Sequence, residues 1–171
     1  MKTKRFSNNL LAGAFVLAGL LLSGCDSTNK LPLASGKSLD LQAEQTLVIN
    51  YWADWCKPCR HEIPELNQLD KEEGITVIGI DFDKHQGQQL DDLIQDMNID
   101  FAVLAGDLEP NAIHPELSRQ AKALPMTYLL TIPAKASGKT ARLSPVFLGP
   151  QTKDGLLKKI STFKTAQAEK S

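Results

Sequence analysis

The chain has 171 residues, enough for one domain of ordinary size with short segments at its ends. Hydrophobic residues make up 42% and charged residues 23%, a balance that excludes a disordered chain, a collagen and a polytopic membrane protein. The net charge is −1, so the basic excess typical of nucleic-acid binding is missing and we expect no nucleic-acid partner. Three cysteines are too few for a disulfide-stapled scaffold.

The N-terminus has the pattern of a secretory signal. Lys2, Lys4 and Arg5 precede an apolar run over residues 10–22. A helix of this length rises about 20 Å, which is short of the roughly 30 Å hydrocarbon core of a bilayer. The run therefore predicts a targeting segment and not a transmembrane helix.

The apolar run ends in Leu22-Ser-Gly-Cys25, which resembles the lipobox of bacterial lipoproteins. The resemblance implies a signal peptide over residues 1–24 and a diacylglycerol on the Cys25 sulfur, which would attach the protein to a lipid bilayer. The alternative is a plain signal peptide with an incidental Cys25 thiol. Cleavage would remove 24 of the 171 residues, among them three basic and no acidic ones, so the net charge would change from −1 to −4. In enteric bacteria, Asp26 would resemble a signal for retention in the inner membrane.

Composition divides the rest of the chain into three parts. Residues 25–37 are mostly polar with proline and glycine, and we expect a lipidated tether there; an ordered arm packed on the domain is the alternative. Residues 38–165 carry the periodic patterns of a folded domain, and residues 166–171 form a tail.

Short apolar runs predict strands and apolar stripes predict helices. In chain order we expect a strand over 46–52, a helix over 56–73 ended by Gly74, a strand over 75–81, a helix over 88–97, a short strand over 101–104, a short helix over 115–122, strands over 126–132 and 142–148, and a closing helix over 155–163. Pro145 places the last strand at a sheet edge or at a bulge. This order predicts an α/β domain whose central mixed sheet has helices on both faces.

The reactive residues gather where the first strand meets the first helix. Cys56 and Cys59 flank two residues at the expected helix N-terminus, where free backbone N–H groups and the macrodipole favour a thiolate. Such a position lowers a cysteine pKa from about 8.5 to roughly 3.5–7.5, and Lys57 adds a positive charge nearby. We expect Cys56 to attack a disulfide and Cys59, one turn deeper, to resolve the mixed disulfide.

Glu62 lies three residues after Cys59 on the same helical face. If this face turns inward, the carboxyl group can exchange a proton with Cys59. The alternative is a solvated surface charge. His61 is on another face and we expect it, like Arg60, to be exposed.

The cysteine pair could instead be structural or bind a metal. A structural disulfide over two intervening residues would close almost no loop and would add little stability. A zinc site needs four ligands, but the sequence has no second CxxC and no HxxxH, and His85 and His114 are isolated. We therefore predict no metal and no cofactor.

The run Trp55-Cys-Lys-Pro-Cys59 after a strand is similar to the thioredoxin-fold signature. The longer stretch around this run, from Asn50 to Pro64, resembles the TlpA/ResA branch of membrane-anchored thioredoxin-like proteins, and the similarity covers roughly residues 38–162. The positions that carry this resemblance are Asn50, Trp52, Ala53, Trp55, Cys56, Pro58, Cys59, Arg60, Glu62 and Pro64. The resemblance implies a thioredoxin fold, a redox-active Cys56–Cys59 pair tuned by Trp55, Lys57 and Pro58, and a proton-handling role for Glu62.

Leu124-Pro125, followed by Thr127-Tyr-Leu-Leu130, is similar to the cis-proline segment of that branch. The resemblance implies a cis bond at Pro125 facing the cysteines, with the backbone at Leu124 able to pair with an extended substrate. Met126 replaces the more usual threonine, and residues 133–145 are longer than the usual hairpin. Both departures border the expected docking groove, so the resemblance does not identify the substrate.

Together these features predict a lipid-anchored, monomeric thiol–disulfide oxidoreductase outside the cytoplasm. The expected partners are disulfide-bearing extracytoplasmic proteins and a membrane thiol–disulfide electron donor. The resemblance favours reduction, and cytochrome c maturation is one pathway that fits. One alternative is a disulfide donor or isomerase. Another is a copper-handling lipoprotein, although no methionine or histidine cluster lies near the CxxC. A peroxidase is disfavoured because the peroxidatic Pro-x-x-x-Thr-x-x-Cys pattern is missing.

Overall fold

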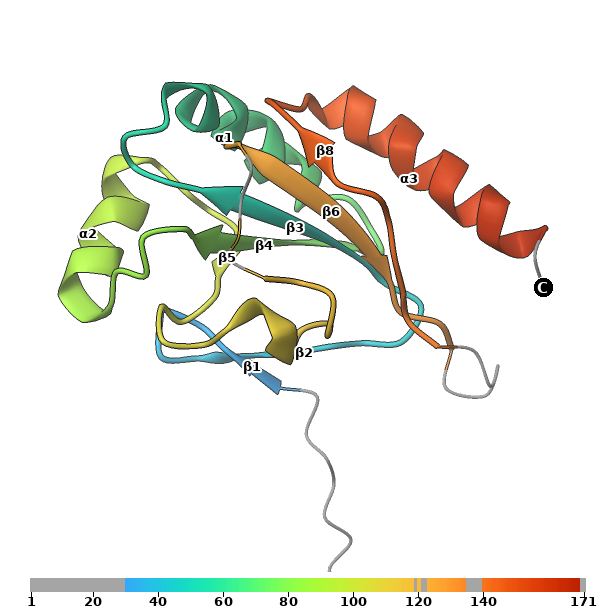
Figure 1. Cartoon of the computed structure of the whole chain (residues 1–171), viewed down its shortest axis with the longest axis horizontal. Helices are drawn as coiled ribbons and strands as arrows, with labels where there is room; N and C mark the ends of the chain where they lie inside the picture. Colours follow the sequence, from blue (N-terminus) through green and yellow to red (C-terminus); the bar gives the residue numbers. More distant parts are fainter. Residues whose placement is uncertain (1–29, 119, 121–122, 135–139, 170–171) are drawn as a thin grey trace, which may run out of the picture.

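The computed structural model describes residues 30–118, 120, 123–134 and 140–169. Its centre is a six-stranded mixed sheet with the order β5-β4-β3-β6-β7, and β8 also pairs with β6 (Figure 1). Strand β3 (Thr46–Trp52) runs parallel to β4 (Ile75–Asp81) and antiparallel to β6 (Met126–Thr131). These three strands agree with the sequence expectations to within one residue.

All seven residues of β3 are buried, because both faces of the sheet are covered. Successive side chains of a strand point to opposite faces. Val48 and Trp52 accordingly join one hydrophobic cluster, whereas Leu47, Ile49 and Tyr51 join a second cluster on the other face.

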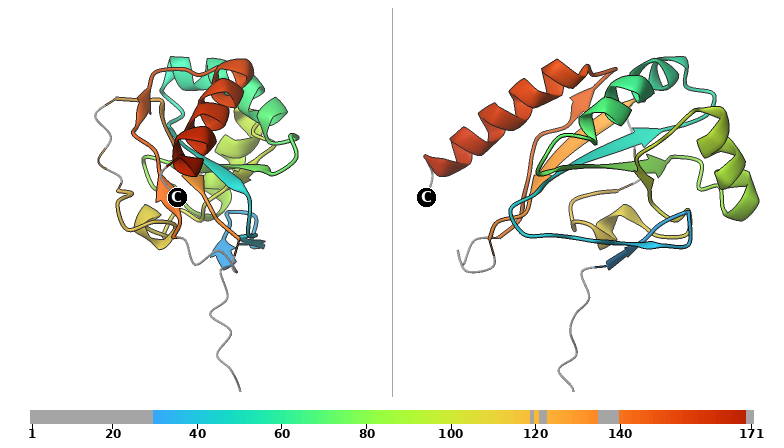
Figure 2. Two further views of the ribbon diagram at one scale, coloured as in Figure 1. Left: turned by 90° about the vertical axis from the view of Figure 1, so that its right-hand side faces the viewer. Right: turned by 180° about the vertical axis from the view of Figure 1, so that it is seen from behind.

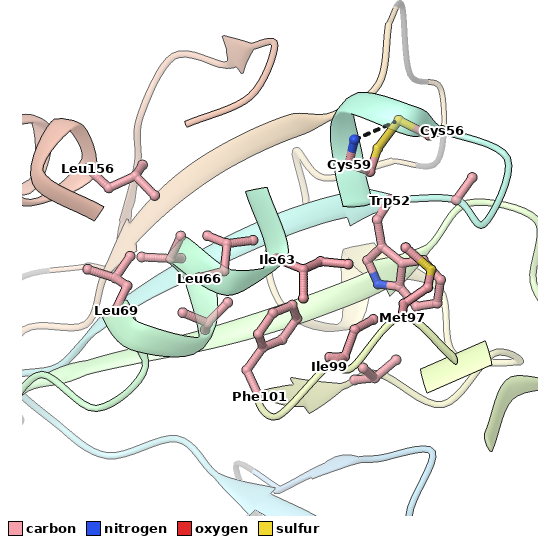
Figure 3. Packing of buried hydrophobic residues seen from close by; sticks show 14 of the residues in the cluster. Trp52, Cys56, Cys59, Ile63, Leu66, Leu69, Met97, Ile99, Phe101 and Leu156 are labelled. Carbon is pink, nitrogen blue, oxygen red and sulfur yellow. Dashed lines mark hydrogen bonds between the residues drawn. A yellow bond between two sulfur atoms is a disulfide. The ribbon is translucent and has the colours of Figure 1, made fainter. Parts of the chain in front are cut away.

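The three α-helices in the described part of the chain pack on the first of these clusters. They are α1 (Lys57–Leu69), α2 (Gly87–Asp96) and α3 (Lys153–Ala168). Ile63 of α1, Leu90 of α2 and Leu156 of α3 are buried in the same cluster as Trp52. In Figure 3 the labelled members extend from Trp52 at one end to Leu156 at the other. Helix α1 ends four residues earlier than expected, at Leu69, and a turn leads to Gly74, which has a φ of 71°.

The second face is covered without an α-helix in the described part of the chain. The antiparallel pair β1 (Lys30–Pro32) and β2 (Ser38–Asp40) lies there together with a 3-10 turn, η1 (Pro110–Ala112). Both views of Figure 2 place this pair on the side of the sheet away from α1. The thioredoxin fold with its mixed sheet is therefore as expected. In the described residues the α-helices lie on one face of the sheet and the 3-10 helix η1 lies on the other.

The helix expected over residues 115–122 is not formed where the chain is described. Residues 115–118 form turns and irregular chain, and η1 precedes them. Leu117 alone is buried among these four residues, so the stretch has no apolar stripe to hold a helix against the sheet. The expectation was wrong over these residues.

The tether expectation also needs correction over its second half. Residues 30–40 form the β1–β2 hairpin, in which Leu31 lies opposite Leu39 and is only 5% exposed. An ordered arm, the alternative to a tether, is what the structure shows from residue 30 onward. The expected signal peptide, Cys25 and the chain up to residue 29 lie outside the described residues.

The edge beyond β6 is broken as Pro145 predicts. Strand β7 (Arg142–Leu143) and strand β8 (Phe147–Leu148) both pair with β6. From Leu143 to Phe147 the edge advances four residues while β6 advances three, from Leu130 to Thr127. One extra residue around Pro145 therefore makes a bulge.

Two further elements, β5 and α3, complete the description. Strand β5 (Ala102–Val103) pairs in parallel with β4 at the opposite edge, where a strand over 101–104 was expected. Helix α3 extends the expected 155–163 at both ends, and Thr152 caps it by accepting a hydrogen bond from the Gly155 N–H group. Within the described residues, no helix combines the length and apolar character needed to span a membrane.

Candidate active site: a disulfide at the start of helix α1

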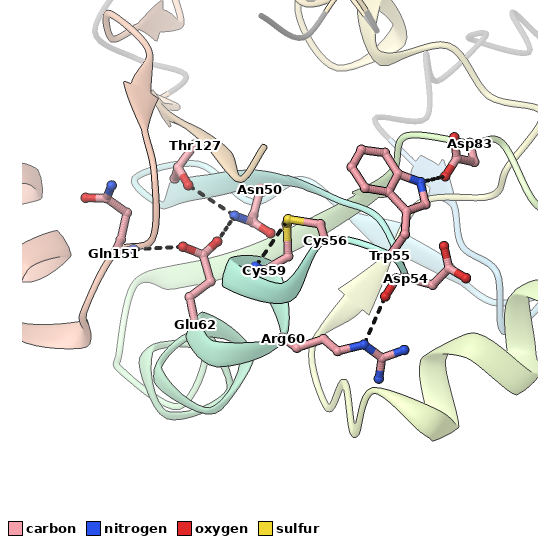
Figure 4. Close-up of a disulfide and its surroundings, with 10 residues drawn as sticks. All are labelled: Asn50, Asp54, Trp55, Cys56, Cys59, Arg60, Glu62, Asp83, Thr127 and Gln151. Carbon is pink, nitrogen blue, oxygen red and sulfur yellow. Dashed lines mark hydrogen bonds between the residues drawn. A yellow bond between two sulfur atoms is a disulfide. The ribbon is translucent and has the colours of Figure 1, made fainter. Parts of the chain in front are cut away.

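Cys56 and Cys59 form a disulfide at the N-terminus of α1, directly after β3 (Figure 4). Cys56 is the N-cap residue, and its Sγ atom accepts a hydrogen bond from the Cys59 N–H group at 3.3 Å. The sulfur therefore sits where unpaired N–H groups and the positive end of the helix dipole stabilise negative charge. Cys56 therefore lies at the helix N-terminus, where the sequence placed it.

Exposure differs along the CxxC segment. Trp55 is 64% exposed, and Lys57 and Pro58 are exposed as well. Cys56 retains 4% exposure, whereas Cys59 is completely buried. A reagent arriving from solvent therefore meets Cys56 before Cys59.

Glu62 is buried beneath this turn of the helix, with 1% exposure. One carboxyl oxygen accepts a hydrogen bond from Asn50 Nδ2, and the other accepts one from the Gln151 N–H group at 2.7 Å. Burial raises the pKa of Glu62 from 4.5 to about 7, although both hydrogen bonds oppose the shift by favouring the carboxylate. The alternative of a solvated charge is thus excluded.

Asn50 connects the three elements of the site. Its side chain leaves β3, donates to Glu62 of α1 and donates to Thr127 Oγ1 of β6 at 3.1 Å. Sequence reasoning missed Gln151, because this residue precedes α3 and carries no motif. Thr127 lay in the expected proline segment without a predicted contact.

The surface beside Cys56 is fixed by two contacts. The Trp55 indole N–H donates to Asp83 Oδ2 at 2.6 Å, and Arg60 Nε donates to the Asp54 carbonyl oxygen at 2.9 Å. Asp83 follows β4, which is parallel to β3, so both strands end at the same edge of the sheet. That shared edge is the signal by which sequence reasoning could have found Asp83. Arg60 and His61 are exposed, as expected.

The Leu124–Pro125 peptide bond is cis, as the resemblance implied. Pro125 is buried, Leu124 is partly buried, and the Pro125 carbonyl oxygen accepts a hydrogen bond from Gly149 at 2.9 Å. Thr127, two residues further on, belongs to the Asn50 network. In the described part of the structure, no group of three or more His, Cys, Asp or Glu side chains is placed to hold a metal ion.

The mixed sheet, the disulfide at the start of α1 and the cis-proline define a protein of thioredoxin fold with a CxxC pair. The chain belongs to the AhpC/TSA family, whose sequence profile matches residues 29–131, more than half of its length.

Individual relatives match a shorter region. Thioredoxin-like protein YneN of Bacillus subtilis is 38% identical over 56 residues, which cover 30% of this chain and 33% of YneN. Thiol-disulfide oxidoreductase ResA of Bacillus anthracis is 37% identical over 54 residues, 29% of this chain and 31% of ResA. These matches confirm the resemblance to ResA-type proteins, and they span about a third of each relative.

A solved structure confirms the fold over most of the chain. The thiol:disulfide interchange protein of the thioredoxin family from Chlorobium tepidum superposes with a TM-score of 0.57 and 23% sequence identity. The superposition covers 78% of this chain and 90% of the other.

Proposed function

We propose that the protein is a thiol–disulfide oxidoreductase whose reacting groups are Cys56 and Cys59. One observation carries the proposal: the Cys56–Cys59 disulfide caps a helix N-terminus with the buried carboxyl group of Glu62 one helical turn further on. A structural bridge would need neither feature. The similarity to ResA, a thiol-disulfide oxidoreductase by name, supports the same activity.

In the reducing direction the dithiol form starts the reaction. The Cys56 thiolate attacks one sulfur of a substrate disulfide, a Cys56–substrate bond forms, and the first substrate thiolate leaves and takes up a proton. Cys59 then loses its proton and attacks the Cys56 sulfur, which releases the second substrate thiolate. The second substrate thiolate is protonated in turn. The substrate has then gained two electrons from the enzyme and two protons, one released by Cys59 and one from solvent, and the enzyme ends as the disulfide seen here. The same steps in reverse would make a disulfide donor.

Glu62 is the proton acceptor we propose for Cys59. A general base works best with a pKa near the operating pH, and the pKa of Glu62 is about 7. Cys59 and Glu62 are both buried and lie three residues apart on α1. Trp55, Lys57 and Pro58 are the exposed residues next to Cys56 in the chain and would tune it. The Leu124–Pro125 segment would pair with the substrate backbone.

We propose that the protein acts outside the cytoplasm, held on the bacterial membrane by a lipid on Cys25. The Lys-rich start, the apolar run and the Leu-Ser-Gly-Cys sequence support this. Its substrates would be disulfide-bearing extracytoplasmic proteins, with a membrane thiol–disulfide donor restoring the dithiol. The domain would act as a monomer.

Trapping tests the order of attack. Cys59→Ser should accumulate mixed disulfides with protein substrates, because Cys56 can attack but nothing resolves the adduct. Non-reducing gels with mass spectrometry would detect the adducts, and Cys56→Ser is the matched control that should trap none. If Cys56→Ser trapped substrates as well as Cys59→Ser, the roles would be reversed; if neither did, the proposed activity would fail.

A further inference from the structure

Asn50 has an unused hydrogen-bond acceptor at the centre of the site. Its side chain is completely buried, and its Nδ2 group uses both hydrogens, on Glu62 and on Thr127. Its Oδ1 atom is buried as well and accepts no hydrogen bond. Such an atom needs an explanation, because buried polar groups in folded proteins nearly always have a partner.

Figure 4 shows what this oxygen faces. The amide oxygen of Asn50 lies on the side of the two sulfur atoms, and the amide nitrogen lies on the side of Glu62 and Thr127. In this structure the sulfur atoms are joined in a disulfide, which has no hydrogen to donate. Reduction adds two electrons and two protons, and a protonated Cys59 carries an S–H donor. Cys59 is completely buried, so this donor needs a partner inside the protein.

We propose that Asn50 is a redox-dependent partner of Cys59: in the dithiol form the Cys59 S–H group donates to Asn50 Oδ1, while Nδ2 stays on Glu62. The inference rests on the proposed dithiol chemistry and adds to it a positioning residue on β3. Because the amide is neutral, it favours the Cys59 thiol over the thiolate and the dithiol over the disulfide. From its place on β3, Asn50 would contact both the proton donor, Cys59, and the proposed proton acceptor, Glu62, of helix α1.

The S–H stretching band tests this bond without any enzymatic assay. In a Cys25→Ser, Cys56→Ser chain, Cys59 is the sole thiol, and serine is a favoured N-cap that should preserve the start of α1. A hydrogen-bonded S–H group absorbs at lower frequency, so adding Asn50→Leu should move the infrared band upward. Thr127→Val removes the other partner of Nδ2 and should leave the band in place. A band unmoved by Asn50→Leu, or moved equally by Thr127→Val, would overturn the proposal.

A second measurement needs no substitution at the site, so misfolding of a variant cannot mask the answer. The ¹³Cγ resonance of Asn50 should move when the wild-type protein is reduced with dithiothreitol, because the carbonyl gains a donor. A third and separate measurement uses the variant: in a glutathione buffer, Asn50→Leu should shift the dithiol–disulfide equilibrium roughly fivefold toward the disulfide. An unchanged ¹³Cγ resonance in a protein that still exchanges disulfides would defeat this inference alone. A shifted resonance in a protein without exchange activity would defeat only the proposed function.

Discussion

Glu62 makes folding stability depend on pH in a specific window. Its native pKa of about 7 lies above the ordinary 4.5 of the unfolded chain, so the native state holds the proton more tightly between these values. The free energy of unfolding should therefore fall as pH rises from about 4.5 to about 7, by roughly 3 kcal/mol at most. In oxidised Glu62→Gln this loss should vanish, as measured by urea unfolding across the window.

A surface variant and a kinetic profile sharpen the Glu62 experiment. Glu73→Gln, at an exposed position in the turn after α1, should keep the pH dependence of the wild type. In disulfide reduction, Glu62→Gln should slow turnover and change the pH–rate profile, because the proton acceptor is lost. Superimposable rate profiles would show that Glu62 plays no part in the chemistry even if its pKa is raised.

At this scale the reacting groups could be located from the sequence, but their partners could not. Cys56, Cys59 and Glu62 follow from the spacing within one helix, which the chain determines locally. The partner of Glu62 at Gln151 is 89 residues away, and it arrives only because β8 turns back beside the site. Contacts of this kind depend on tertiary packing and leave no local pattern.

Among the strands, Gly79 of β4 makes room for the core. A Cβ atom there would lie 2.8 Å from Trp52 Nε1 and 2.9 Å from Phe101 Cε2. Gly79→Ala should therefore lower the free energy of unfolding by about 1–3 kcal/mol in urea titrations, because overpacked cores must shift or strain.

A second substitution identifies the cause of that loss. Phe101→Leu shortens one of the two crowding side chains, so it should cost less stability in the Gly79→Ala background than in the wild type. Equal costs in both backgrounds, or a Gly79→Ala protein as stable as the wild type, would contradict the packing argument.

The strand predictions were confirmed for the three central strands, each of which has a neighbouring strand on both sides. Strands β3, β4 and β6 are long apolar runs, and their bounds match the expected ranges to within one residue. The helix expected over 115–122 is not formed over residues 115–118, because a single buried leucine there does not supply an apolar stripe. The β1 strand was missed because three residues with one buried apolar side chain carry no period, and only pairing with β2 reveals it.

For the whole molecule, the proposed lipid on Cys25 should decide where the protein is found. Cys25→Ser should leave an uncleaved precursor, since the lipoprotein peptidase acts after acylation. Fractionation with mass spectrometry of the N-terminus would check this, and Ser23→Ala, which keeps a small residue before the cysteine, is the control that should still be processed. A soluble, normally processed form of Cys25→Ser, starting at residue 25, would refute the anchor.

The early start of β1 limits how far an anchored domain can travel. Strand β1 begins at Lys30, so only residues 26–29 would separate it from a lipidated Cys25, and even a fully extended chain of that length reaches roughly 17 Å. The β1–β2 pair lies on the side of the sheet away from α1 (Figure 2). So short a connection would keep the face with the β1–β2 hairpin near the lipid headgroups. The face with α1 and the two sulfur atoms would then point toward the aqueous space. The anchored protein would then reach only proteins that come within one domain's width of the membrane.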